Sequence, residues 1–390
     1  MINREDIREL AQFQGTGADC AISFYFQPSQ PRNNSHREDA ILAKDLIRAA
    51  LREAEKNGRN GCARGDLQRI LDLAATWSGS QARAKVVFAC GSRNFWREFD
   101  LPAELAETQL FLNRRFHLKP LALVMAAQPR LEVALVDRHR ARFFDLHLDD
   151  LKEGEALFHA LPRRGRGDGF AGYDAGHAQR SVKDEILHHF KNVAEYLQQG
   201  QDKGAFDNLI IGCHDINWRE LEPQLHPYVK KRLLGRFSAD VGTITEDQVR
   251  EQAHRILRQS LDQHRQDLVN EILGQAKSNG RGVTGLRRVL RSLEMGEVQV
   301  LLMATNYSAH AVECANCGHL DAHMVRYCPV CGHATQELED VCDAIVPGAI
   351  RRDVELLYVK DEPELDRVGN IAALLRFRAD QNRGESAAAS

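Results

Sequence analysis

The sequence predicts a mixed α/β protein of three domains, the last of which carries a small zinc ribbon. Its 390 residues exceed the roughly 150 residues of one ordinary domain. Short apolar segments alternate with longer segments of helical periodicity along most of the chain, which indicates sheets flanked by helices. Two Cys-x-x-Cys pairs lie close together between residues 314 and 331.

The first predicted domain, residues 1–128, is an α/β unit. The run Ala-Ile-Ser-Phe-Tyr-Phe at 21–26 is apolar and is followed by two prolines, as expected of a buried strand. A glycine-rich, basic loop is predicted over 57–65, and its composition alone favours a solvated connection between helices. The other predicted elements are a helix from a capping box at 35–38 to about Lys56, a helix over 66–75 and a strand over 85–90.

The second predicted domain, residues 129–271, is a mixed sheet with flanking helices. Two apolar runs on either side of Asp137–Arg140 predict a β-hairpin. A glycine-rich loop over 163–176 cannot pack a core by itself. The helix after it has one apolar face, and a buried strand over 208–212 and a polar helix over 245–270 follow. Members of that apolar face are Ile186, His189, Phe190, Val193 and Leu197.

The third predicted domain, residues 272–390, is an αβα layer with the cysteine pairs inserted at 312–334. A helix over 285–296 ends at a glycine and leads into a strand over 298–303. A helix over 336–346 and a strand over 354–359 are predicted after the insertion. The polar, alanine-rich segment 381–390 has the composition of a disordered tail.

The cysteine pairs give the most specific chemical signal. Four thiolates at this spacing can occupy the corners of a tetrahedron about 2.3 Å from a zinc ion. Because protein supplies every ligand, the pattern predicts structural zinc and leaves no position for a substrate. Gly318 and Gly332 after the pairs suit the tight turns that bring amides close to the sulfurs. The predicted ligands are Cys314, Cys317, Cys328 and Cys331. Three histidines are close enough in sequence to replace a thiolate, but we expect them on the ribbon surface: His319, His323 and His333.

Composition favours a cytoplasmic protein. The nine cysteines do not form the dense, even-numbered pattern of a secreted disulfide scaffold. No signal segment opens the sequence, and no run of about 18 apolar residues occurs, so we expect no membrane partner. A formal net charge of −3 argues against purely electrostatic binding of nucleic acid, and we expect no DNA partner. A few basic loops could still contact RNA.

Catalytic motifs are absent from the sequence. It has no phosphate-binding Gly-x-x-x-x-Gly-Lys loop, no His-Glu-x-x-His and no Gly-x-Ser-x-Gly. Cys213-His214-Asp215 combines residue types used in catalysis. However, adjacent residues leaving a strand point in different directions, so we do not expect a working Cys–His pair.

Several segments resemble archaeal and eukaryotic class-1 peptide release factors and Pelota, in matching order along nearly the whole chain. Gly285–Leu302 resembles their third domain, which in the archaeal factors also carries a two-knuckle zinc insertion. Leu161–Gly167 and His188–Glu195 resemble the catalytic loop of the release factors and its following helix. Ala21–Pro28 and Phe111–His117 resemble their stop-codon-reading domain, whereas the first domain of Pelota is unrelated. The resemblance implies a three-domain release-factor-like architecture with an RNase-H-like middle domain.

The chain departs from this family in two places: the tip that hydrolyses peptidyl-tRNA and the signatures that read the stop codon. Release factors hydrolyse peptidyl-tRNA with a Gly-Gly-Gln tip, but this chain has no Gly-Gly pair. Gln179 lies three residues beyond Gly176, and we expect it in the helix start. The loop at 57–65 stands in place of Asn-Ile-Lys-Ser, and Phe111–Phe116 lacks the cysteine of the Tyr-x-Cys-x-x-x-Phe element.

The resemblance therefore implies a bacterial, Balon-like ribosome hibernation factor that binds the ribosomal A site without catalysis. It implies contacts with rRNA of both subunits and with a translational GTPase, for which EF-Tu is the bacterial candidate. The residues expected to face the peptidyl-transferase centre are Arg163, Arg164, Gly165, Arg166, Gly167, Gly169, Gly172 and Gly176. Those expected near the decoding centre are Lys56, Arg59 and Arg64.

Two alternatives stay open. The first is a rescue or release factor that hydrolyses peptidyl-tRNA through Gln179 or a backbone amide of the glycine loop. The second is an interaction protein that uses the same scaffold away from ribosomes.

Overall fold

The computed structural model divides the chain into two compact units. Unit 1 combines residues 1–126 and 265–390, and unit 2 comprises residues 127–264. The middle domain predicted at 129–271 largely corresponds to unit 2, and the three-domain division itself stays a prediction. The structure describes residues 2, 4–15, 20–27, 36–56, 60–77, 84–101, 107–127, 129–147, 150–158 and 174–377.

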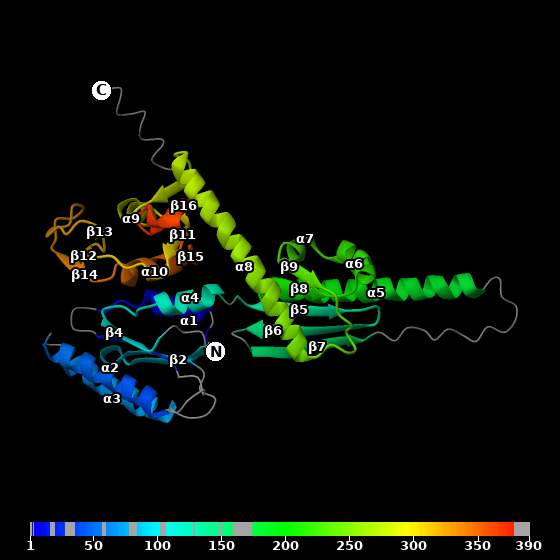
Figure 1. The fold of residues 1–390 in the computed structure, drawn as a ribbon, viewed down its shortest axis with the longest axis horizontal. Helices are drawn as coiled ribbons and strands as arrows, with labels where there is room; N and C mark the ends of the chain where they lie inside the picture. Colours follow the sequence, from blue (N-terminus) through cyan, green and yellow to red (C-terminus); the bar gives the residue numbers. More distant parts are fainter. Residues whose placement is uncertain are drawn as a thin grey trace, which may run out of the picture. The chain divides into compact units, whose positions relative to one another are not determined.

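The first sheet of unit 1 is antiparallel, in the order β3-β2-β1-β4. Alternate residues of β1 face two long helices, because Ile22, Phe24 and Phe26 pack against the apolar stripes of α2 and α3. Figure 1 shows the two helices side by side below this sheet. The elements are α1 (Arg4–Gln12), β1 (Ala21–Phe26), α2 (His36–Lys56), α3 (Asn60–Trp77), β2 (Ala84–Cys90), β3 (Phe95–Leu101), β4 (Gln109–Asn113) and α4 (Lys119–Ala127).

The predicted β1, β2 and α2 are confirmed, but the predicted loop at 57–65 is wrong from Asn60 onward. There α3 has already begun. Ala63, Leu67 and Ile70 recur at helical spacing and are fully buried, so their burial favours helix over this segment. Gly65 lies on the exposed face of α3, where a glycine costs about 1 kcal/mol relative to alanine and is tolerated.

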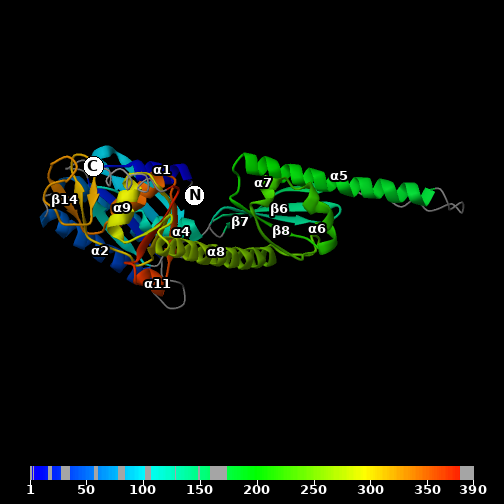
Figure 2. The ribbon, with the colours of Figure 1, turned by 90° about the horizontal axis from the view of Figure 1, so that it is seen from above.

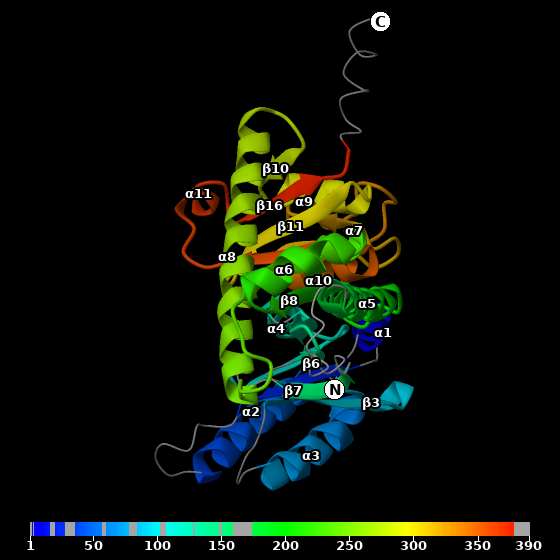
Figure 3. The same ribbon diagram turned by 90° about the vertical axis from the view of Figure 1, so that its right-hand side faces the viewer.

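The second sheet of unit 1 has the order β10-β16-β11-β15, with β11 and β15 parallel. Its strands are rich in aliphatic residues, and all five residues of β16 are buried. Figure 3 shows α9 beside β10, β16 and β11. The elements are β10 (Gly282–Thr284), α9 (Leu286–Glu294), β11 (Val298–Ala304), α10 (Cys342–Arg351), β15 (Glu355–Val359), α11 (Pro363–Asp366) and β16 (Ile371–Leu375).

A third, small sheet of unit 1 has the order β13-β12-β14 and carries the cysteine pairs. Its strands are β12 (Ala311–Cys314), β13 (Leu320–Asp321) and β14 (Thr335–Leu338). The helix predicted over 336–346 is therefore wrong at its start, since 335–338 is a strand and α10 begins at Cys342. The cause is pairing, because β14 lies antiparallel to β12 with Ala311 opposite Leu338.

Unit 2 is a five-stranded mixed sheet in the order β7-β6-β5-β8-β9. The predicted hairpin is confirmed, with β5 antiparallel to β6, whereas β8 and β9 run parallel to β5 and to each other. Seen from above in Figure 2, the sheet lies between α5 on one side and α8 on the other. The elements are β5 (Leu131–Val136), β6 (Arg140–His147), β7 (Asp150–Phe158), α5 (Asp174–Asp202), β8 (Asn208–Gly212), α6 (Asp215–Leu221), α7 (Pro227–Lys230), β9 (Leu233–Phe237) and α8 (Glu246–Lys277), of which the residues from Arg265 onward belong to unit 1.

Each face of the unit 2 sheet has its own apolar core. The predicted apolar face of α5 is confirmed, and its Phe190, Val193 and Leu197 pack on one sheet face. Val249 and Ala253 of α8 help to cover the other face. The first turns of α5 extend past the edge of the sheet in Figures 1 and 2. Among the described residues, no helix is both long enough and apolar enough to span a membrane.

Candidate functional site

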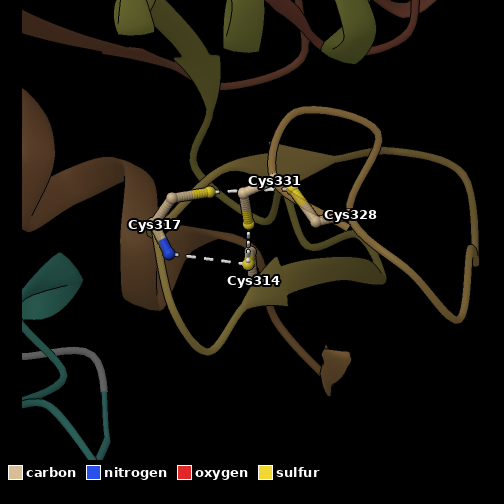
Figure 4. Close-up of side chains that lie close together, drawn as sticks. All are labelled: Cys314, Cys317, Cys328 and Cys331. Atoms are coloured by element: carbon tan, nitrogen blue, oxygen red, sulfur yellow. Dashed lines mark hydrogen bonds between the residues drawn. The ribbon is translucent and has the colours of Figure 1, made fainter. Parts of the chain in front are cut away.

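The predicted cysteine pairs meet in one cluster at the end of the small sheet. Their sulfur atoms all lie within 4.8 Å of one another. Cys314 Sγ is 3.3 Å from Cys331 Sγ, and Cys317 Sγ is 3.6 Å from Cys328 Sγ. Figure 4 shows the four side chains converging from the two turns. Ligands at 2.3 Å in a tetrahedron place their sulfurs about 3.8 Å apart, so this spacing fits a four-thiolate metal ion.

Two turns of matching geometry hold these sulfurs. In the first turn, the amide of Gly318 donates to the carbonyl of Cys314 at 3.1 Å, and in the second the amide of Gly332 donates to Cys328 at 2.9 Å. Both glycines have positive φ, 73° and 75°, which a side chain would strain. The Asn316 amide lies 3.4 Å from Cys314 Sγ, so a backbone hydrogen already points at this sulfur.

The same environment divides the thiols into stronger and weaker acids. A backbone hydrogen bond from His333 and the neighbouring Cys314 thiol lower the pKa of Cys331 to about 5. For Cys317, a backbone hydrogen bond from His319 acts toward a lower pKa, but burial and the surrounding thiols raise the pKa to about 12. Four adjacent sulfurs cannot all ionise without a cation, whereas a divalent metal ion would stabilise them together.

The three histidines of the ribbon are outside the cluster, as expected. His319 Nδ1 lies 2.8 Å from Glu294 Oε1, and His323 Nδ1 lies 3.1 Å from Asp321 Oδ1. Glu294 also accepts the amide of Leu320 at 3.0 Å, so the end of α9 anchors β13. Sequence reasoning missed this role of Glu294, because nothing in the spacing links it to a strand 26 residues later.

The predicted glycine-rich arm falls mostly outside the described residues. This applies to Arg163, Arg164, Gly165, Arg166, Gly167, Gly169 and Gly172. The loop predicted over 163–176 is wrong from Asp174 onward, because α5 begins there and the backbone of Gly176 is helical. The backbone of Gln179 is helical as well, so its expected position in the helix start is confirmed. Val182 packs at the margin of the unit 2 core. A helix rises 1.5 Å per residue, so the start of α5 at Asp174 lies ~12 Å beyond Val182.

Two of the three predicted decoding-centre residues lie at one end of the α2–α3 helix pair. Lys56 is the last residue of α2, and Arg64 is exposed in the second turn of α3. Arg59 falls outside the described residues. The structure thus brings Lys56 and Arg64 to the same end of this hairpin.

Cys213, His214 and Asp215 do not form a catalytic group. Cys213 is 2% exposed, and burial raises the pKa of its thiol. His214 Nδ1 lies 3.0 Å from Ser238 Oγ, whereas Asp215 Oδ1 lies 3.4 Å from a guanidinium nitrogen of Arg236. The partners of His214 and Asp215 therefore lie outside this group of three residues, as their positions after β8 suggested.

The chain is similar to archaeal release factors and to a bacterial family related to them. The model of Bacterial archaeo-eukaryotic release factor family 10 matches residues 117–258. "Peptide chain release factor subunit 1" of Pyrococcus abyssi is 24% identical over 309 residues, covering 71% of this chain and 74% of the relative. The protein of the same name from Thermococcus sibiricus is 23% identical over the same shares.

Solved structures of release factors and Pelota are also similar. The archaeal translation termination factor aRF1 has a TM-score of 0.26 and 15% identity, covering 96% of this chain and 99% of its own. Archaeoglobus fulgidus Pelota has a TM-score of 0.32 and 13% identity, covering 96% of this chain and 93% of its own.

Proposed function

The chain belongs to the bacterial branch of the archaeo-eukaryotic release factor and Pelota superfamily, and on this premise we propose that it binds the ribosomal A site without hydrolysing peptidyl-tRNA. It would act in the cytoplasm as a ribosome hibernation factor, in which a release-factor scaffold occupies idle ribosomes. Similarity to proteins named peptide chain release factor supports the ribosome as partner.

One observation carries the non-catalytic part of the proposal. The chain has no Gly-Gly pair, although the family's hydrolytic tip requires Gly-Gly-Gln. Two adjacent glycines allow a backbone turn that other residues resist, and the glutamine helps to position water at the ester. Gln179 is an inadequate substitute because its backbone is already helical in α5. Loss of the motif on a retained scaffold favours occupancy of the ribosome over peptide release.

The arm before α5 would provide the contact with the large subunit. Arg163, Arg164 and Arg166 can pair with rRNA phosphates, and the glycines allow the backbone to follow a narrow RNA-lined channel. The extension of α5 beyond the sheet supports this role. The helix start that follows the arm lies ~12 Å from Val182, which packs at the edge of the unit 2 core.

The end of the α2–α3 hairpin would provide the contact with the small subunit. Lys56 and Arg64 lie there, and Arg59 lies between them in the sequence. Cations gathered at the end of a helix pair suit phosphate contacts in the decoding centre.

Two further assignments complete the proposal. The third predicted domain would contact a translational GTPase, with EF-Tu as the candidate. The metal of the four-cysteine cluster would be zinc, because tetrahedral thiolate ligation suits Zn²⁺ and leaves no open position for catalysis. Metal analysis of protein purified under reducing conditions without chelator should give about one zinc per chain; a metal-free protein would contradict the assignment.

The ribosome contact is tested by co-sedimentation with vacant ribosomes. We expect conversion of Arg163, Arg164 and Arg166 to alanine to weaken binding at least tenfold and to reduce its salt dependence. A matched control removes three exposed arginines of α9, Arg287, Arg288 and Arg291, and should bind normally when no GTPase is present. Equal binding by both triple variants would remove the role of the arm.

The rescue-factor alternative makes the opposite prediction in a single-turnover assay on stalled ribosomes. Rapid peptide release that disappears with Gln179→Ala would show hydrolysis and overturn the non-catalytic proposal. The non-ribosomal alternative predicts no enrichment in ribosomal fractions, even from starved cells.

A further inference from the structure

A polar cavity within unit 1 is lined by arginines from distant parts of the sequence. Its volume is about 410 Å³, within the range of about 300–1,000 Å³ usual for small-molecule sites. Its walls include the turn after β4, the end of α9, the first cysteine turn and the end of α10. The charged lining residues are Arg114, Arg115, Glu294, Glu313, Arg351 and Arg352.

The two carboxylates of the lining already have partners. Glu313 receives two hydrogen bonds from the guanidinium of Arg115, one of them at 2.9 Å, and both side chains are only 17% exposed. Glu294 accepts from His319 and from the amide of Leu320. The wall therefore holds four guanidiniums against two carboxylates, and these carboxylates are engaged.

The other three guanidiniums have neutral partners. Arg114 donates to the Gln336 side-chain oxygen, Arg351 to the Ala11 carbonyl at 2.7 Å, and Arg352 to the Gly348 carbonyl at 3.3 Å. Within the described part of the chain, no carboxylate lies within ion-pair distance of any of the three. A guanidinium has five N–H donors, so each retains donors for another acceptor.

These cations also influence one another. Burial lowers the pKa of Arg351, and the charges of Arg115 and Arg352 act in the same direction, whereas Glu313 opposes them. Partly buried like charges are unfavourable without an anion between them. Guanidinium forks match phosphate oxygens in a planar, two-point geometry, which is why arginine predominates in phosphate recognition.

We propose that this cavity binds a compact phosphate-bearing anion through Arg114, Arg351 and Arg352. The three guanidiniums recognise phosphate oxygens, which inorganic phosphate, pyrophosphate and the phosphate tail of a nucleotide have in common. A long RNA backbone fits less well, because Glu294 and Glu313 share the wall and would repel a continuous line of phosphates.

Binding would join the two sequence segments of unit 1. Arg114 belongs to the 1–126 segment, whereas Arg351 and Arg352 belong to the 265–390 segment. A ligand that binds only when both segments are in place stabilises their association, and the stabilisation grows with the logarithm of the ligand concentration above the dissociation constant. The site would thus link the concentration of a small anion to the stability of unit 1.

The arginines have one competing explanation. A zinc ion with four thiolates would carry two negative charges, and Cys314 and Cys317 line the same cavity. If the guanidiniums served only as counter-ions of that centre, their removal would weaken zinc binding and leave phosphate binding unchanged. The two explanations therefore predict different losses in the same variants.

The test uses the full, zinc-loaded chain in a buffer free of phosphate and sulfate. Inorganic phosphate, pyrophosphate and ATP without magnesium are titrated separately by calorimetry. We expect one site per chain for at least one of the three, and a rise in the thermal midpoint with ligand. Arg351→Gln and Arg114→Gln should each weaken binding at least tenfold, whereas Arg287→Gln, exposed on α9 outside the cavity, should not.

Several results would overturn the proposal. One is that none of the three anions binds at 10 mM, a concentration on the order of the weakest useful affinities. Another is that both cavity variants bind the anion as the native chain does. A third is that the cavity variants lose zinc but still bind phosphate. Competition by a short single-stranded RNA for the same arginines, with no small anion bound, would assign the cavity to RNA instead. Should one variant fail to fold, the other decides, because Arg114 and Arg351 have different intramolecular partners.

Discussion

The cysteine ribbon and the sheet of unit 2 are held together by different means. The unit 2 sheet has an apolar core on each face. The ribbon has strands of two to four residues, and three of its large apolar side chains are exposed: Met324 at 52%, Tyr327 at 69% and Val330 at 69%. Apolar burial therefore suffices for the sheet, whereas we expect the ribbon to depend on the metal ion proposed for its four cysteines.

Metal removal should give the largest difference between these two regions. Structural zinc contributes on the order of 10 kcal/mol in small zinc modules. We expect Cys314→Ser, or a strong chelator, to abolish amide-exchange protection across 311–338 and leave β5 and β8 protected. Hydrogen exchange with mass spectrometry provides the measurement.

A matched control is Cys213→Ser, which changes a buried thiol outside the cluster. It should leave the ribbon protected. Retained ribbon protection in Cys314→Ser would show that the ribbon folds without its metal.

The second prediction reverses the comparison by damaging the apolar core of unit 2. Phe190 is fully buried between α5 and the sheet, so Phe190→Ala should destabilise unit 2 by about 3–5 kcal/mol. Trp218 is the one tryptophan of unit 2. In a background with Trp77 and Trp96 replaced by phenylalanine, its fluorescence during urea unfolding measures the loss of unit 2 stability. Phe158→Ala, at a 62% exposed position, should cost less than about 1 kcal/mol, and an equal loss in both would contradict a packed core.

The same contrast explains what could be predicted from the sequence. Local patterns sufficed for the cysteine cluster, for the apolar face of α5 and for the β5–β6 hairpin. The sequence of β14, Thr335–Leu338, has no strand alternation, and its extended state comes from pairing with β12. The cavity could not be predicted from the sequence either, because Arg114 and Arg351 meet through tertiary packing that no periodicity encodes.

Glu132 gives a pH-dependent prediction for unit 2. It is opposite Asp145 across the β5–β6 pair, and burial, with the charge of Asp145, raises the pKa of Glu132 to about 8. A carboxyl whose folded pKa exceeds its unfolded pKa is stabilising when protonated. That stabilisation is complete below about pH 4.5 and is lost as the pH rises toward 8.

Glu132→Gln should therefore be more stable than the native chain by at most about 3 kcal/mol near pH 7, with little difference at pH 4.5. Urea midpoints of unit 2 measured across this pH range test the prediction. Glu220→Gln, an exposed carboxylate on α6, should not change the pH profile. A pH-independent difference for Glu132→Gln would rule out the proton-linked explanation.

The smallest expected effect concerns the polar link between the two segments of unit 1. Asp343, in the first turn of α10, lies 2.5 Å from His117 Nδ1 and accepts from Asn113 Nδ2 at 2.7 Å. His117 is 5% exposed and its ring stacks on Phe111, so Asp343→Ala would leave a buried imidazole without this acceptor. We expect a loss of about 2 kcal/mol in unit 1, read from Trp77 and Trp96 fluorescence during urea unfolding. Asp366→Ala, exposed in α11, is the control, and a loss no larger than that of the control would mean that apolar packing alone joins the segments.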